Sequence, residues 1–492
     1  MEIVNKSLTI DVDLDDDVWG EIVKVTKTHD DISLIVKGVG INMSKLVIPE
    51  SISSIEFKYC SFNEEIEICG LEKGRYFGIK NCKKNFIFGN VTLKEICCRV
   101  FSFIEETPEN IDEEELFSNL NLSPFIKNCA FHHFNCHSIS CPEFTNVVFI
   151  DKFTYRCILA NENISLFFGN CRFISGLKIE VLDVDNLEII IKKSQVTDKD
   201  NHEDLFQSLS GLVSFNVSKN TVIKNIEVFD SKLKGMNFYF FKKRIENVDI
   251  KKSVLGILEF YTASDDENNY IYNINIIESE VDKLSLRYKN IVHEMSLLNT
   301  TFNAPPELLG ANIPSGSIFP KKEYFKSRSG VHDASCYRNI RFAMESQRDR
   351  DLEGMFFGLE QESIMNIKDG VSKYFSLSYL YLVLSNYGTN YTRPLIILSL
   401  SIIFFSLTNS ILLSPIVSPS LPIDWELVFR SFILTIKQVL QPFSTLKDIS
   451  FNIEESGTVN YLYVIFGVIN SLISIGCIAL SALAIRWKFK RG

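Results

Sequence analysis

Residues 128–137 read NCAFHHFNCH, and Cys141 follows four positions later. Cysteine and histidine are common zinc ligands, so this stretch looks at first like a metal site. The alternative is that Cys129 and Phe131 are packing residues of a strand, because residues two apart in a strand point to the same face. The remainder of the sequence decides between these interpretations.

A pattern of one small residue, any residue and one large apolar residue recurs through the first 300 positions. The copies are Ser44-x-Leu46, Cys60-x-Phe62, Cys129-x-Phe131, Val147-x-Phe149, Cys171-x-Phe173, Ser194-x-Val196, Ser231-x-Leu233, Ser253-x-Leu255, Ser279-x-Val281 and Thr300-x-Phe302. Most neighbouring copies are 16 to 26 residues apart, a spacing typical of a solenoid. We predict stacked β-coils with an inner ladder of Cys and Ser beside another of Phe, Leu and Val.

This pattern favours packing over metal binding in the opening stretch. Cys129 and Phe131 occupy the same repeat positions as Cys171 and Phe173, near which no histidine lies. The other polar residues of the stretch fall on both parities of the strand: His133 and Cys141 on that of Cys129, and His132 and Cys136 on the other. A single strand does not readily converge both faces on one ion, and a free thiol packs as a small hydrophobe. We therefore predict no metal and no cofactor.

Two uncharged apolar runs near the C-terminus, residues 395–413 and 461–485, are long enough to cross a bilayer as helices. The second is followed by four basic residues, Arg486, Lys488, Lys490 and Arg491. By the positive-inside rule the C-terminus is cytoplasmic. Two spans then place the N-terminal region on the same side, which agrees with the lack of an apolar signal run at the start.

The predicted fold class is mainly β: an irregular right-handed β-helix, a pentapeptide-like solenoid, followed by a helical linker and a two-helix transmembrane domain. The predicted parts are an N-terminal cap (1–34), a cytosolic solenoid (35–304), a linker (305–332), a helical juxtamembrane segment (333–393) and a two-span membrane domain (394–492). Between the spans, residues 425–443 read as a re-entrant or interfacial helix that ends at Pro442.

The chain resembles bacterial membrane proteins in which pentapeptide-like repeats precede a helical segment and a C-terminal two-span domain similar to an ion channel. The motifs that carry the resemblance are the small-x-large repeats, YRNIRFAMES and LEGMFFGLEQES (337–346 and 352–363), LSNYGTNYTRPL (384–395) and FRSFILTIKQVLQPFS (429–444). The repeats depart from a strict pentapeptide solenoid, with one good copy per coil. The resemblance implies a location in the bacterial inner membrane and favours a homo-tetramer.

The helix between the spans is the main candidate for function. The residues after it, Ser444 to Lys447, contain no glycine, so the potassium-channel filter is absent. Arg430, Lys437 and Gln441 share one helical face, which in an oligomer would line a vestibule and favour anions. The alternative is an amphipathic helix whose cations contact lipid phosphates.

Small residues on the second span predict how copies would associate. Gly467, Ser471 and Ser474 lie on one row of the helix, with Gly476 on a neighbouring row. Small residues let helix backbones approach closely in lipid. A pore on a symmetry axis needs several copies, so we predict a homo-oligomer held by these residues.

Composition and motifs exclude other classes of protein. The net charge of −10 argues against nucleic-acid binding, and the phosphate-loop, dinucleotide and nucleophile-elbow motifs are absent from the sequence, so we predict no enzyme activity. Charged insertions at 105–115, 197–204 and 264–269 would protrude from the coils, either as solvated loops without a partner or as a surface for a cytosolic protein partner. We predict an oligomeric two-pass protein in which a solenoid sensor or interaction domain controls a channel-like, ion-conducting or permeabilising membrane domain. The alternative is a membrane-tethered scaffold that binds a partner without conducting.

Overall fold

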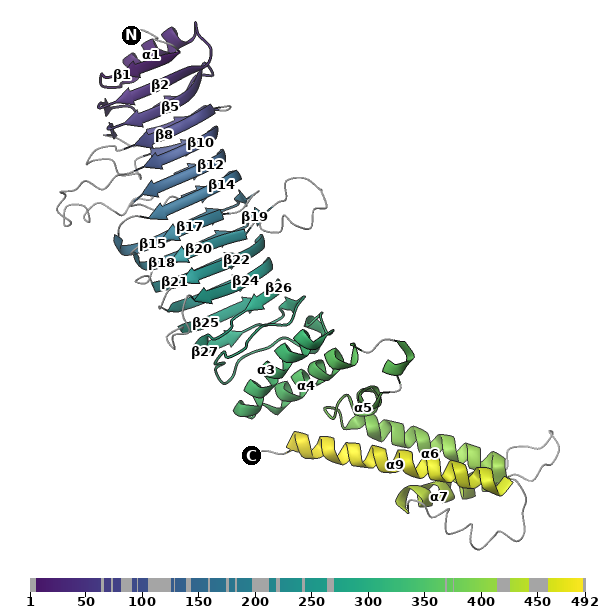
Figure 1. Ribbon diagram of the computed structural model, residues 1–492. Helices are drawn as coiled ribbons and strands as arrows, with labels where there is room; N and C mark the ends of the chain where they lie inside the picture. The colour runs from purple at the N-terminus through teal and green to yellow at the C-terminus, as the bar shows by residue number, and fades with distance from the viewer. Residues whose placement is uncertain are drawn as a thin grey trace. The chain divides into compact units, whose positions relative to one another are not determined.

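The structure is a computed structural model, and its chain divides into two compact units, Met1–Ser327 and Arg328–Gly492 (Figure 1). We call them the solenoid unit and the helical unit, and describe each by itself. The structure describes residues 6–62, 66–71, 74–80, 91–94, 96–104, 125–127, 129–138, 143–157, 160–173, 177–181, 184–196, 212–217, 222–240, 244–262, 270–367, 370–374, 376–413, 425–441 and 459–489.

The solenoid unit is a parallel β-solenoid, as its sequence predicts. Within the described residues, one sheet has 15 strands: β1 (Ser7–Ile10), β2 (Ile32–Lys37), β5 (Ile52–Lys58), β8 (Gly74–Lys80), β10 (Cys97–Ile104), β12 (Ala130–Ser138), β14 (Val148–Cys157), β16 (Arg172–Phe173), β17 (Leu177–Val181), β19 (Gln195–Val196), β20 (Leu212–Val217), β22 (Lys232–Phe240), β24 (Val254–Thr262), β26 (Glu280–Ser285) and β28 (Thr301–Phe302). Neighbouring strands pair in parallel along the stack (Figure 1).

A second sheet of 11 described strands completes the coils. Its strands are β4 (Lys45–Val47), β7 (Ile66–Cys69), β9 (Val91–Lys94), β11 (Phe125–Lys127), β13 (Glu143–Thr145), β15 (Ala160–Gly169), β18 (Val184–Lys192), β21 (Val222–Phe229), β23 (Ile245–Lys251), β25 (Tyr270–Ile277) and β27 (Asn290–Ser296). A short pair, β3 (Gly40–Ile41) and β6 (Ser61–Phe62), forms a separate sheet. Along the chain, strands of the second sheet alternate with one or two strands of the larger sheet.

The apolar side chains of both sheets form the core of the solenoid. Along β2, Ile32, Leu34 and Val36 are buried and alternate with more exposed residues. Phe173 stacks on Phe149 of the coil before, with ring centroids 5.3 Å apart and planes 7° from parallel. Such ladders arise because parallel pairing places equivalent residues of successive coils in register.

The ladder of small residues is confirmed at Cys60, which is fully buried, and from Cys129 to Thr300. Its members are buried in register: Cys129, Val147, Cys171, Ser194, Ser231, Ser253, Ser279 and Thr300. In the hydroxyl part the backbone N–H of Ser194 donates to Ser231 Oγ at 3.1 Å, and the N–H of Ser231 donates to Ser253 Oγ at 3.2 Å. The ladder is therefore bonded from coil to coil as well as packed.

The prediction for the first copy of the pattern is wrong. Ser44 is exposed, although Leu46 is buried. Pairing of β3 with β6 instead places Val39 and Ile41 in the coil before Cys60 and Phe62. Val39 and Ile41 fit the small-x-large pattern as Val147 and Phe149 do, but this copy was not included in the prediction.

A left-handed backbone conformation precedes the small residue of most coils and turns the chain into the next strand. Positive φ angles occur at Tyr59, Asn146, Asn170, Lys193, Asp230, Lys252, Glu278 and Asn299, each directly before a ladder residue. Asparagine and aspartate tolerate this conformation better than most residues. At the other corners the residue adopts the left-handed conformation although its type does not favour it. This indicates that the ladder contacts outweigh the local strain.

Strand pairing extends beyond the predicted limits of the solenoid at both ends. β1 pairs with β2 inside the range predicted as a cap, and helix α1 (Asp16–Thr26) lies at the same end (Figure 1). Trp19 and Ile22 of α1 are buried, and Trp19 Nε1 donates to the Val47 carbonyl at 3.3 Å. At the other end, isolated bridges such as Ser296↔Ile318 and Phe302↔Phe325 form one more irregular coil from the range predicted as a linker, which includes the short helix η2 (Lys322–Tyr324).

The helical unit begins with a helical hairpin, α3 (Val331–Gln347) and α4 (Arg350–Met365). The chain reverses at Arg348, in the left-handed conformation, and the Asp349 side chain caps α4 by accepting from the Leu352 N–H at 3.0 Å. The helices that follow are η3 (Gly370–Lys373), α5 (Leu377–Ser385), α6 (Thr392–Leu413), α7 (Trp425–Leu440) and α9 (Val459–Phe489). Within the described residues, two helical segments are long and apolar enough to cross a membrane: Thr392–Leu412 and Leu462–Arg486.

Candidate functional site

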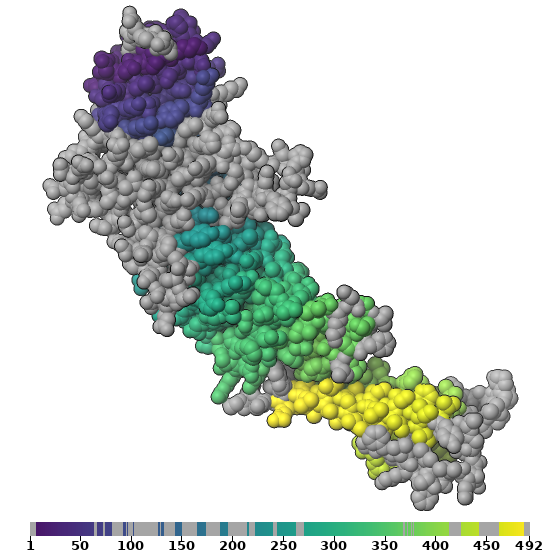
Figure 2. Space-filling view, viewed as in Figure 1, coloured from purple at the N-terminus to yellow at the C-terminus, as the bar shows by residue number. Residues whose placement is uncertain are grey.

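The three C-terminal helices α6, α7 and α9 pack against one another with an unusual distribution of polarity. The surface of α9 carries large apolar residues, including Leu472, which is 57% exposed, and Figure 2 shows the side chains of this helix (yellow) at the surface of the helical unit. The residues it buries against its neighbours are mostly small or polar: Gly467, Asn470, Ser471, Ser474, Cys477, Ser481 and Ala484. A soluble helix has the opposite pattern, so this one is suited to an apolar solvent.

Helix α7 has three distinct faces. Its buried face is polar and consists of Ser431, Thr435 and Gln438. Its apolar face is exposed and comprises Trp425, Phe429, Phe432, Ile433 and Leu440. Its charged face, which includes Arg430 and Lys437, is also exposed. The apolar face would be unfavourable in water and favourable in lipid, whereas the charged face needs water or another polar surface.

Side-chain hydrogen bonds join the buried face of α7 to both candidate spans. Asn409 of α6 donates through Nδ2 to Thr435 Oγ1 at 3.2 Å, and Asn470 of α9 donates through Nδ2 to Gln438 Oε1 at 3.1 Å. Gln438 in turn donates through Nε2 to the Tyr463 hydroxyl at 3.4 Å. We call the buried polar residues that meet here the polar seam: Asn409 of α6, Ser431, Thr435 and Gln438 of α7, and Asn470, Ser471, Ser474 and Ser481 of α9.

The residues predicted to line a vestibule all lie on the exposed charged face of α7. Arg430, Lys437 and Gln441 are exposed. Arg430 pairs with Glu426 one turn earlier, at 2.6 Å between Nη2 and Oε1. The predicted face therefore carries an acidic member, which the sequence interpretation did not include.

The residues predicted to join neighbouring copies have a different place in the structure. Gly467, Ser471 and Ser474 are buried within the single chain, and Ser471 Oγ donates to the Gly467 carbonyl at 2.9 Å and lies 3.5 Å from the Gln438 carbonyl. Gly476 is half-buried, with open space around its Cα. The polar residues Asn409, Thr435, Gln438 and Asn470 were missed by sequence reasoning. The sequence feature that could have identified them is the presence of two asparagines inside otherwise apolar spans.

A tyrosine in the loop before α6 connects the first span to the helical hairpin. Tyr387 is 3% exposed, has a positive φ of 58°, and packs its ring edge-on against Phe357 of α4 at 6.3 Å. Its hydroxyl lies 3.9 Å from Met365 Sδ. Three residues later, Asn390 Oδ1 accepts from the N–H of Thr392 at 3.0 Å at the start of α6. The loop before α6 is therefore anchored to α4 through Tyr387.

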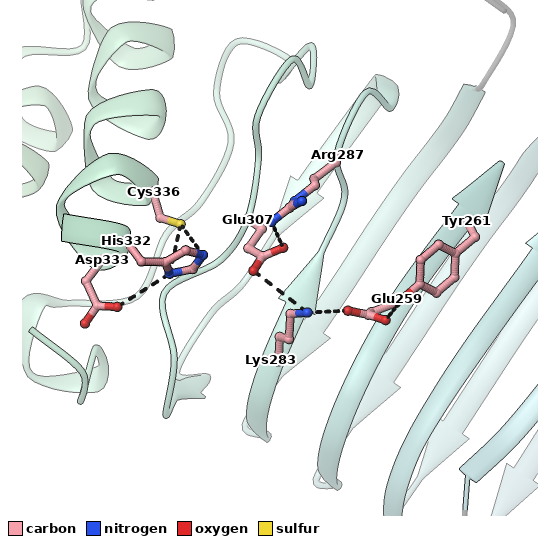
Figure 3. Close-up of polar contacts among 8 residues, drawn as sticks. All are labelled: Glu259, Tyr261, Lys283, Arg287, Glu307, His332, Asp333 and Cys336. Atoms are coloured by element: carbon pink, nitrogen blue, oxygen red, sulfur yellow. Dashed lines mark hydrogen bonds and ion pairs between the residues drawn. The ribbon is translucent and has the colours of Figure 1, made fainter. Parts of the chain in front are cut away.

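The solenoid unit carries a linked group of charged side chains on and next to strands β24 and β26 of its larger sheet (Figure 3). Lys283 Nζ lies 2.6 Å from Glu259 Oε1 and 3.9 Å from Glu307 Oε1, and Arg287 lies 2.8 Å from Glu307. Tyr261 donates to Glu259. Burial would raise the pKa of Glu259, but the hydrogen bonds from Lys283 and Tyr261 hold it below its usual value. Opposite charges are matched within this group, so its role is the joining of coils.

The described residues hold no group of three or more His, Cys, Asp or Glu side chains placed to bind a metal ion. Cys129 lies in the inner ladder, where its Sγ donates to the Lys127 carbonyl at 3.1 Å. The side chains of His132, His133 and Cys136, and all of Cys141, lie outside the described set. The three charged insertions of the sequence interpretation, 105–115, 197–204 and 264–269, also lie outside the described residues.

The fold and the site define the class: a parallel β-solenoid joined to a helical unit that has two candidate membrane spans. A comparison of the chain with family models, curated proteins and solved structures finds no match.

Proposed function

We propose that the protein is a two-pass membrane protein in which a cytosolic solenoid controls a conducting C-terminal domain made of several copies. The bacterial inner membrane is its proposed location, and a tetramer its proposed state. The proposal rests on the sequence resemblance to pentapeptide-repeat proteins with channel-like domains, and on the three faces of α7.

The charged face of α7 is the observation that carries the proposal. Glu426, Arg430, Lys437 and Gln441 are exposed on a helix whose adjacent face presents Phe429, Ile433 and Leu440 to the outside. If the apolar face contacts lipid, the charged face lies next to it in the same membrane unit. Ionisable groups in a membrane unit face a water-filled path or a polar partner. Copies arranged around an axis would bring these faces together around water.

A second candidate function is a membrane-tethered scaffold that does not conduct. It is favoured by the place of Gly467, Ser471 and Ser474, which are occupied inside one chain and so are not available as the predicted contact between copies. The spans would then serve as an anchor, and the solenoid would bind a protein partner.

Purified full-length protein in liposomes separates the two functions. Conductance above protein-free liposomes, with a change in anion preference for Arg430→Gln combined with Lys437→Gln, is expected for the conducting protein. The matched control is Lys326→Gln, a charge change in the solenoid unit. Liposomes that stay tight at every protein density would support the scaffold.

A further inference from the structure

The polar seam contains buried atoms that have no hydrogen-bond partner in the structure. They are Asn409 Oδ1 of α6, Ser431 Oγ of α7, and Asn470 Oδ1, Ser474 Oγ and Ser481 Oγ of α9. Asn470 and Ser474 are 0% exposed, and Asn409 is 1% exposed. An unsatisfied polar group costs several kcal/mol in an apolar medium. Five such atoms between three helices therefore indicate that something polar occupies the seam.

The two asparagines approach each other along α7. Their amide groups donate to Thr435 and Gln438, which are three residues apart on one helical face. Three residues correspond to about 4.5 Å along a helix axis. The free oxygens of Asn409 and Asn470 consequently lie within about one helical turn of each other in depth, and Ser431 and Ser474 are each one turn further along their own helices. The unpartnered atoms of Asn409, Ser431, Asn470 and Ser474 therefore lie within a few helical turns of one another, whereas Ser481 lies about two turns beyond Ser474 along α9.

The chemistry of the atoms selects the ligand. Amide oxygens need a hydrogen-bond donor, whereas each serine hydroxyl also carries a proton that needs an acceptor. A bare cation offers no acceptor, and an anion offers no donor. No charged side chain belongs to the seam, which disfavours a bound ion of either sign. Water supplies donors and acceptors together, and buried waters usually bridge such groups.

We propose that the polar seam binds a cluster of water molecules between α6, α7 and α9, inside each single chain. This water lies on the intrachain side of α7, away from its exposed charged face. Since the inference rests on the proposed placement of α6 and α9 in a membrane, it deepens the proposed function. It gives each chain bound water of its own, separate from any water-filled path between copies.

Cys477 provides a natural reporter of this water. It lies on the buried row of α9 between Ser474 and Ser481 and is 1% exposed, whereas the next residue, Ile478, is 45% exposed on the outer side at the same depth. X-ray radiolysis converts bound water into hydroxyl radicals where it lies, so no reagent has to enter the seam. Thiols react readily with these radicals, and peptide mass spectrometry quantifies each site.

The experiment compares wild-type protein with Cys477→Ser combined with Ile478→Cys, both full-length in lipid nanodiscs. We expect Cys477 to be modified several-fold faster than the cysteine at 478, and Asn470→Leu to remove most of that difference. If Asn470→Leu does not fold, Ser474→Ala replaces it, with a smaller decrease expected. Equal or slower modification of Cys477 would overturn the proposal. Liposome conductance is measured separately, so a dry seam in a conducting protein, or a wet seam in a tight one, distinguishes the two proposals.

Discussion

The backbone N–H of Ser231 donates to the side-chain oxygen of Ser253, 22 residues later and one coil along, at 3.2 Å. Ser253 Oγ in turn donates to the Lys251 carbonyl at 2.8 Å. The same relationship links Cys171 to Ser194, Ser194 to Ser231 and Ser253 to Ser279. The hydroxyl ladder thus replaces a backbone acceptor at each corner, where the sheet hydrogen bonds are interrupted.

Removal of one ladder hydroxyl should destabilise the solenoid. Ser253→Ala leaves the buried N–H of Ser231 without the hydroxyl that accepts its hydrogen bond, and we expect a loss of about 1–3 kcal/mol in the free energy of unfolding. Urea denaturation followed by circular dichroism measures it. Val254→Ala, at an exposed neighbouring position, is the control and should have little effect. Equal stability of Ser253→Ala and wild type would contradict a bonding role for the ladder.

Substitutions at a cysteine and at a phenylalanine of the solenoid core should have very different effects on the free energy of unfolding. Cys171→Ser should cost about 1 kcal/mol or less, because serine occupies the next rung and makes the same contact with the carbonyl two residues before it. Phe173→Ala should cost about 3–5 kcal/mol, since Phe173 is fully buried and stacked on Phe149. Arg172→Ala, exposed between them, serves as the control.

The zinc content of the purified protein tests whether residues 128–141 bind a metal instead of packing. Purified protein should contain no stoichiometric zinc by elemental analysis. Zinc that is present at one equivalent and lost in Cys129→Ser would overturn the packing interpretation of residues 128–141.

Lys289 should make the stability of the solenoid unit depend on alkaline pH. Burial lowers its pKa from 10.5 to about 8. Between these values the unfolded chain binds the proton and the folded chain does not, so the free energy of unfolding rises with pH in that window. Below about pH 8 the folded state holds a charged buried amine, and stability is lower. Lys289→Met should therefore be more stable near neutral pH.

The measurement is a pair of urea titrations at several pH values from 7 to 10.5, the second pH being the unperturbed value for lysine. Subtraction of the Lys289→Met curve from the wild-type curve isolates this residue from the titration of tyrosines. A difference that does not change across the window would show that the amine has the same pKa in both states.

Orientation in the membrane is tested by cysteine labelling with an impermeant reagent in intact cells. We expect no labelling at Tyr288→Cys, an exposed solenoid position, and labelling at Ser418→Cys, which lies between the candidate spans in the sequence. Both expectations follow from the basic residues after the second span, at 486–491. Labelling of Tyr288→Cys from outside would place the solenoid on the opposite face.

Sequence periodicity was sufficient for the solenoid because each coil repeats one requirement, a small buried residue two positions before a large one. This reasoning fails at Ser44. The buried residues of that coil, Val39 and Ile41, are determined by strand pairing, which a local sequence pattern does not contain. The candidate spans were equally predictable from length and lack of charge. Their contacts were not, because Gly467 and Ser471 look the same in sequence whether they face a second copy or, as in the structure, α7 of the same chain.

The polar seam was beyond prediction for a related reason. Asn409, Gln438 and Asn470 are separated by about 30 residues at each step, and single polar residues in apolar helices do not reveal which of them meet. Only the packing of three helices brings their amides together. Helical periodicity alone places Arg430, Lys437 and Gln441 on one face of α7, but it does not show what that face contacts.

Helix α1 has a consequence for self-association. A stack of identical parallel strands ends in an edge with unpaired N–H and C=O groups, and such an edge is a template for the addition of further strands. At the first coil, Trp19 and Ile22 are buried and Trp19 Nε1 donates to Val47, so side chains of α1 occupy the end of the core. A chain with Trp19 and Ile22 replaced by aspartate should lose this barrier. Its monomers would then add end to end, and the resulting polymer would grow with a nucleation lag and a critical concentration, as a fibre does.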